Sequence, residues 1–129
     1  MALFTWYNKN TVNNEELDEH HKALFDIFNK LYSICFEKKN YKCIGPIVEE
    51  LISYSHYHFS AEETHMVRIG FKELDRHIIE HMQFGLRTLQ LQQVAENNEH
   101  EATKELIISL GVWLLNHVII EDKKYSVEF

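Results

Sequence analysis

The sequence has little proline and little glycine, with one proline and four glycines in 129 residues. Such low numbers are unusual for a protein of strands and turns and normal for a helical one. Two cysteines, Cys35 and Cys43, are too few for a disulfide framework, and we expect ordinary buried or half-buried thiols. With 45% hydrophobic residues, residues 1–129 can form a single domain with its own core.

An excess of positive charge is also missing, since the formal net charge is −7. This excludes nucleic acid and anionic membrane as expected partners, because both require a basic face. The start, MALFTWYNKN, lacks the charged and apolar regions of a signal peptide, so we expect a cytoplasmic protein. The most apolar segment, LIISLGVWLLNHVII, is shorter than the roughly 20 residues of a bilayer span and predicts a buried helix.

Four stretches of the chain show the apolar period of a helix. Pro46 suits the first turn of the second helix, and Gly70 suits the end of that helix. Because the connections are short, neighbouring helices should pack antiparallel. The sequence therefore predicts an all-α protein, an up-down antiparallel four-helix bundle with an N-terminal arm. The predicted arm covers residues 1–13, and the predicted helices cover residues 14–38, 46–67, 72–97 and 100–122.

Histidine, in contrast, is abundant, with nine in the chain. Five histidines stand at core-facing steps of the four helical patterns: His21, His58, His77, His81 and His117. A buried imidazole needs a hydrogen-bond partner or a metal ion. Glu62 follows His58 by four residues and shares its helix face. No lysine or arginine stands in these stripes, so the positive charge that this carboxylate needs is best supplied by metal ions.

A second inward carboxylate is expected near the end of the fourth helix. Asp122 follows His117 by five residues, which would place it inward only in a loosened last turn, and Glu121, four residues after His117, is the alternative. Five imidazoles and two carboxylates are too many for one tetrahedral zinc ion. They suit two six-coordinate ions that share the carboxylates and keep a position open. Nitrogen and oxygen donors without thiolate favour iron, and also manganese, so a di-iron centre for dioxygen is predicted.

Four motifs occur in order along nearly the whole chain: LDEHHKALF, HFSAEETHM, HIIEH and WLLNHVIIEDKKY. With them the sequence resembles the hemerythrin family, most closely its single-domain bacteriohemerythrins. The resemblance implies Asp122 as the ligand in place of Glu121, and Glu62 and Asp122 as bridges between two oxo- or hydroxo-bridged irons. It implies that one iron is held by His77, His81 and His117. The other would be held by His21 and His58 and would keep a position open for dioxygen.

The resemblance also implies a ligand pocket, lined by Leu24, Phe59, Trp113, Leu114 and Val118. No further acid or base is expected in this wall, which favours reversible dioxygen binding over catalysis. We therefore expect an oxygen carrier, storage or delivery protein and not an enzyme, with no protein partner indicated. The alternatives are a sensor or scavenger of oxygen or nitric oxide and a di-iron oxidase. Ferritin-like oxidases use two Glu-x-x-His pairs, whereas this chain has one, Glu62 with His65.

The remaining histidines are expected to lie outside the centre. His20 replaces a glutamine that is common in the family motif, and we expect it on the surface together with His56 and His100. His65 is three residues after Glu62, near the core face, where it would be a partner of the ligands or a spare ligand. An interfacial or exposed position is the favoured interpretation for His65.

Overall fold

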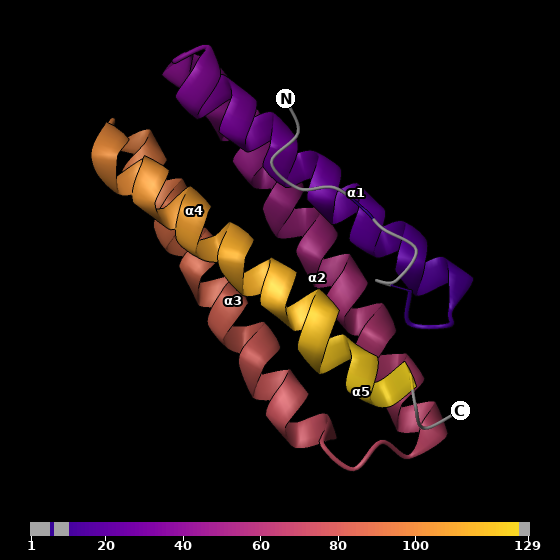
Figure 1. The fold of residues 1–129 in the computed structure, drawn as a ribbon. Coiled ribbons are helices and arrows are strands. Elements are labelled where there is room, and N and C mark those ends of the chain that lie inside the picture. Colours follow the sequence, from indigo (N-terminus) through magenta and orange to yellow (C-terminus); the bar gives the residue numbers. More distant parts are fainter. Residues whose placement is uncertain (1–5, 7–10, 127–129) are drawn as a thin grey trace.

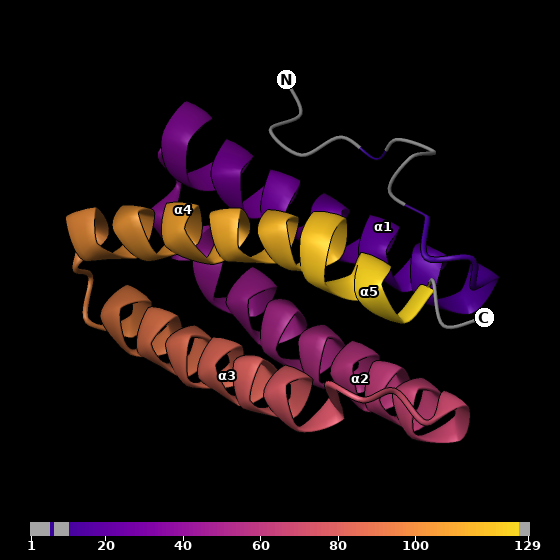
Figure 2. The ribbon, with the colours of Figure 1, turned by 60° about the horizontal axis from the view of Figure 1, so that its bottom comes forward.

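The computed structural model describes residue 6 and residues 11–126, and the elements in this part of the chain are all helical (Figure 1). The elements are α1 (Glu15–Tyr32), η2 (Ser33–Glu37), η3 (Tyr41–Cys43), α2 (Ile44–Ile69), α3 (Leu74–Glu96), α4 (His100–Asn116), η4 (His117–Glu121) and α5 (Asp122–Ser126). Consecutive long helices lie side by side, and α4 also contacts α1, which closes the bundle (Figures 1 and 2). The predicted up-down four-helix bundle is confirmed.

The helices begin and end at residues that satisfy their free backbone groups. At the start of α1 the side chain of Asn14 accepts a hydrogen bond of 3.1 Å from the backbone N–H of Leu17. At the end of α2 Gly70 adopts a left-handed conformation with φ of 68°. This conformation lets the N–H of Phe71 donate to the carbonyl of Met66 and stop the helix, as the sequence predicted for Gly70.

The fourth predicted helix, 100–122, is not a single regular helix. Between His117 and Glu121 the chain forms a π-helical turn, in which the N–H of Asp122 donates to the carbonyl of His117. A π turn carries one more residue than an α turn, so residues five apart come to share a face. The helix then continues to Ser126, beyond the predicted end. The π turn therefore brings His117 and Asp122 to the same side of the helix.

Two hydrophobic clusters fill the interior. The larger contains Leu24, Phe28, Leu91 and Leu110, and the smaller contains Leu17, Met66, Phe71 and Tyr125 among its members. Along each long helix the predicted metal-binding residues occur between members of the two clusters or residues packed against them. On α1, for example, Leu17 precedes His21 and Leu24 follows it. The polar centre is thus enclosed by apolar side chains at both ends.

The stretch His100–Tyr125 is long and apolar enough to cross a membrane by length and composition, a test that the core helix of a bundle also passes. Here its Leu110, Leu114 and His117 are buried inside the bundle.

Most of the predicted arm 1–13 lies outside the described residues. Its described Trp6 lies with its ring centroid 6.2 Å from that of His21.

Candidate metal centre

The structure brings all seven predicted metal-binding residues together in the middle of the bundle. These seven donor residues are His21, His58, Glu62, His77, His81, His117 and Asp122, and none is more than 4% exposed. Their nitrogen and oxygen atoms form three overlapping groups, each compact enough to hold a metal ion. We call His21 and His58 the two-histidine half of the centre, and His77, His81 and His117 its three-histidine half.

Asp122 connects the two halves. Its Oδ2 lies 3.0 Å from Nε2 of His21, in the two-histidine half. Its Oδ1 lies 3.0 Å from Nε2 of His117 and 3.4 Å from Nε2 of His77, in the three-histidine half. The carboxylate therefore presents one oxygen to each half, which is the arrangement that a bridging ligand requires.

Glu62 also contacts both halves. Its Oε2 lies 3.3 Å from Nε2 of His21. Its Oε1 lies 3.2 Å from Nε2 of His58 and 3.3 Å from Nε2 of His81. All five imidazoles thus turn Nε2 toward the two carboxylates.

Several of these inward atoms are buried and have no hydrogen-bond partner among the described residues. They include Nε2 of His58 and His77, Oε1 of Glu62 and both carboxylate oxygens of Asp122. For example, Nε2 of His58 lies 3.2 Å from Oε1 of Glu62, and Nε2 of His77 lies 3.4 Å from Oδ1 of Asp122. Buried polar atoms are normally paired, so their convergence on common points fits metal ions as the missing partners. The set has only imidazole and carboxylate donors, which suits iron or manganese.

Protons balance the carboxylate charges in the metal-free chain. Burial disfavours the charged imidazole of His21, but the adjacent carboxylates of Asp122 and Glu62 outweigh this effect and raise its pKa to about 9. In the same way Asp122, against the effect of burial, raises the pKa of His117 to about 10. Burial opposes ionisation of Glu62, yet the neighbouring imidazoles, His58 first, lower its pKa. Metal ions would displace the protons of His21 and His117.

The stability of the metal-free chain should therefore depend on pH. The raised pKa values of His21 and His117 stabilise the fold fully below the ordinary value of 6.5, and this contribution is lost as the pH rises through about 9 to 10. We expect the free energy of unfolding, measured by urea titration with a chelator present, to fall over this range. A His56→Gln control should keep the same slope, because His56 is exposed. A stability that stays constant or rises over this range would contradict these protonation states.

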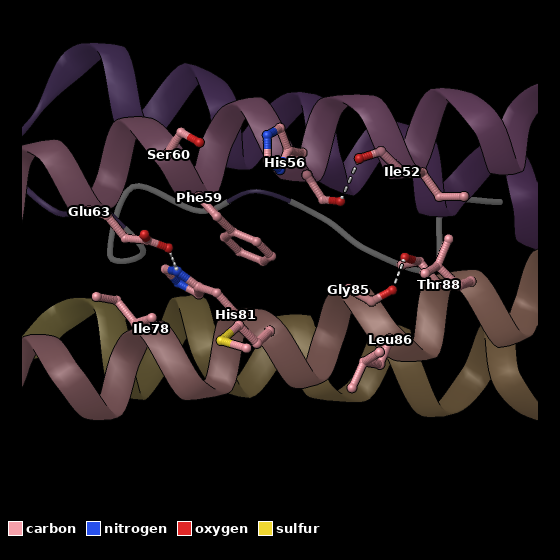
Figure 3. A pocket seen from close by; sticks show the side chains of 13 residues that line it. Ile52, His56, Phe59, Ser60, Glu63, Ile78, His81, Gly85, Leu86 and Thr88 are labelled. Carbon is pink, nitrogen blue, oxygen red and sulfur yellow. Dashed lines mark hydrogen bonds and ion pairs between the residues drawn. The ribbon is translucent and has the colours of Figure 1, made fainter.

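The outward nitrogens of three imidazoles each lie close to a further polar side chain. Nδ1 of His81 lies 2.8 Å from Oε2 of Glu63, and both residues line a pocket between α2 and α3 (Figure 3). Nδ1 of His117 lies 3.2 Å from Oε2 of Glu80. Nδ1 of His58 lies 3.1 Å from Nδ1 of His20. Such partners orient an imidazole and fix which nitrogen carries its proton.

Sequence reasoning missed part of this surrounding layer. The expectation of a surface position was wrong for His20, which is 5% exposed, and is confirmed for His56 and His100. His65 is only 8% exposed, with its ring against Tyr125, so an exposed position was wrong for it too. Among the thiols, Cys35 is buried as expected, whereas Cys43 is exposed. Glu63 directly follows Glu62 and Glu80 directly precedes His81, and this adjacency was the available signal.

Tyr125 was also missed, because the predicted helix ended at Asp122. It lies three residues further on, in α5, and its side chain is fully buried. Its hydroxyl donates a hydrogen bond of 2.8 Å to Oε2 of Glu62. Burial and the nearby Glu62 raise the pKa of Tyr125 well above its usual value, so the hydroxyl keeps its proton. Tyr125 therefore holds Glu62 in place without adding charge.

Removing this hydroxyl should destabilise the chain. In Tyr125→Phe the buried Oε2 of Glu62 loses a donor, and we expect the free energy of unfolding of the metal-free chain to fall by about 1–3 kcal/mol. Urea unfolding of the variant beside wild type measures the difference. Tyr57→Phe is the matched control, because Tyr57 is 56% exposed. Equal stability of Tyr125→Phe and wild type would show that this hydrogen bond contributes nothing.

The five predicted pocket residues lie in or against the larger hydrophobic cluster. Leu24, Leu114 and Val118 are fully buried. Phe59 stacks on His81 with ring centroids 3.9 Å apart, and Trp113 stacks on His117 at 4.5 Å. The two aromatic rings therefore shield the three-histidine half from solvent. The lining of a ligand pocket by these five residues stays a prediction.

Fold and site together define a four-helix bundle whose interior can hold metal through histidine and carboxylate side chains. Residues 12–126 match the family model of the hemerythrin HHE cation binding domain. The chain belongs to the hemerythrin family.

Relatives cover nearly the whole chain. A bacteriohemerythrin of Methylococcus capsulatus is 32% identical over 127 residues, covering 98% of this chain and 96% of the relative. A bacteriohemerythrin of Clostridium acetobutylicum is 27% identical over 128 residues, covering 95% of this chain and 98% of the relative. The crystal structure of a wild-type hemerythrin superposes with a TM-score of 0.86 at 31% identity, covering 98% of this chain and 97% of that one.

Proposed function

We propose that the protein binds dioxygen reversibly at a non-haem di-iron centre held by the seven donor residues. The observation that carries this proposal is the unequal division of imidazoles between two halves that share both carboxylates. An ion in the three-histidine half would have five protein ligands, whereas an ion in the two-histidine half would have four. The ion in the two-histidine half would thus keep an open coordination position for a small ligand. Hemerythrin-family proteins bind non-haem iron and dioxygen.

The chain itself supplies binding, orientation and exclusion of water. The imidazoles would hold the ions through Nε2, while Glu62 and Asp122 would bridge them and neutralise part of their charge. Iron, when bound, supplies the electrons and the coordination position for dioxygen. Leu24, Leu114 and Val118 are fully buried and keep bulk water and acid from the interior. A dry centre favours release of the ligand unchanged over its further reaction.

The placement of acidic groups supports binding over catalysis. Glu63 and Glu80 contact the outward nitrogens of His81 and His117, so neither faces the interior of the centre. Tyr125 keeps its proton and donates a hydrogen bond to Glu62. None of these groups is placed as a general acid or base for a substrate in the two-histidine half. A carrier, storage or delivery role follows, as is general in the family.

Reversible oxygenation can be tested on one iron-loaded sample. The chain is reduced without oxygen, exposed to air and then evacuated, while visible absorption is followed and iron is counted. We expect two irons per chain and an oxygen-dependent visible band that disappears under vacuum and returns with air. Two irons that convert directly to a stable oxidised form would favour an oxidase, a scavenger or a sensor over a carrier.

A further inference from the structure

His20 lies at the contact between α1 and α2, directly behind His58. The residue is 5% exposed, and its ring centroid lies 5.0 Å from that of Tyr57 and 5.2 Å from that of His58. Nδ1 of His20 and Nδ1 of His58 are 3.1 Å apart, within hydrogen-bond distance. The chain thus places a buried imidazole behind one of the five inward imidazoles.

The direction of this hydrogen bond follows from the inward nitrogen. Nε2 of His58 faces the carboxylates, and as a metal ligand it carries no proton. A neutral imidazole has one N–H, so the proton of His58 is then on Nδ1. Nδ1 of His20 must accept that hydrogen bond, which places the proton of His20 on its Nε2. That nitrogen lies 3.9 Å from Oε1 of the exposed Glu16. The N–H of His20 is thus near a carboxylate, and its unprotonated nitrogen is near the N–H of His58.

The other half of the centre is supported differently. There the outward nitrogens of His81 and His117 meet carboxylates, Glu63 at 2.8 Å and Glu80 at 3.2 Å. Behind His58 the acceptor is an imidazole, which carries no full negative charge when neutral. Because His58 belongs to the two-histidine half, removal of this acceptor should act on that half.

We infer that His20 is a positioning residue, which fixes the tautomer and ring orientation of His58 by accepting its Nδ1–H. The inference rests on the proposed di-iron function, because it requires a metal ion at Nε2 of His58. It assigns to the two-histidine half a specific support that the seven donor residues do not provide.

The first test measures metal affinity in wild type, His20→Leu and His20→Gln. Fe²⁺ is added without oxygen and free metal is read by competition with a chelator, which resolves two binding constants per chain. His20→Leu removes the acceptor and should weaken one of the two constants about 10- to 100-fold, leaving the other unchanged. His20→Gln offers an amide oxygen as acceptor and should stay close to wild type. His56→Leu, at an exposed histidine on α2, is the matched control and should change neither constant.

A second readout does not depend on affinity. In the Zn²⁺-loaded chain, NMR can follow the exchange of the His58 Nδ1–H with solvent. This proton should be protected in wild type and His20→Gln, and should exchange much faster in His20→Leu, which circular dichroism must show to be folded.

The outcomes separate the inference from the function on which it rests. A wild type that binds two ions, with a His20→Leu variant that keeps both constants or weakens both equally, would overturn the role of His20 alone. An unchanged exchange rate in folded His20→Leu would overturn it as well. A wild type that binds fewer than two ions would overturn the proposed function and, with it, the inference.

Discussion

Replacing Glu62 with alanine should reduce bound iron to well below two per chain. Its two carboxylate oxygens contact imidazoles of both halves, at 3.3 Å from His21 and 3.3 Å from His81. Without Glu62 both proposed ions lose a ligand, and the anionic charge that offsets theirs falls by one. The hydroxyl of Tyr125 also loses its acceptor. Iron per chain, counted after loading under reducing conditions and desalting, measures the effect.

The neighbouring residue provides the control for this prediction. Glu63→Ala removes a carboxylate that contacts only the outward nitrogen of His81, so it should retain most of the iron. His58→Ala should lose iron, because His58 is one of only two imidazoles in its half. If Glu62→Ala and His58→Ala both kept two irons per chain, the assignment of the donor residues would fail.

Replacing Phe28 with alanine should lower the free energy of unfolding by about 3–5 kcal/mol. Phe28 is fully buried in the larger hydrophobic cluster, and its ring centroid lies 6.5 Å from that of Phe84 on α3. The cavity left behind cannot be filled by neighbouring side chains without moving helices. Because Phe28 is not one of the seven donor residues, iron per chain should stay at two in the folded variant. Urea unfolding and iron counting on the same preparation measure both effects.

An exposed apolar residue provides the control for Phe28. Leu86 lies on α3 and is 64% exposed, so Leu86→Ala should change stability by only about 0.5 kcal/mol or less. A Phe28→Ala variant no less stable than Leu86→Ala would show that the larger cluster does not carry the fold.

The helices were predictable because their apolar residues repeat with a clear period, and Pro46 and Gly70 marked the two ends of the second one. The five inward histidines followed from the same period. Asp122 was uncertain from spacing, because five residues do not make one turn of a regular helix. The π turn after His117 removes this difficulty, and only the backbone of the structure shows it.

The layer behind the donor residues could not be predicted in the same way. His20 is next to His21 but points to a different side of α1, and its burial depends on how closely α2 packs there. Tyr125 faces Glu62 because the helix resumes after the π turn. Both contacts are set by packing between helices, which the apolar period of a single helix does not encode.

In the proposed centre the seven donor residues hold two irons side by side. X-ray absorption at the iron K edge of the loaded chain tests this pairing. We expect a shell of only nitrogen and oxygen neighbours and a second iron within about 4 Å. A spectrum without iron–iron scattering, or with sulfur in the shell, would contradict it.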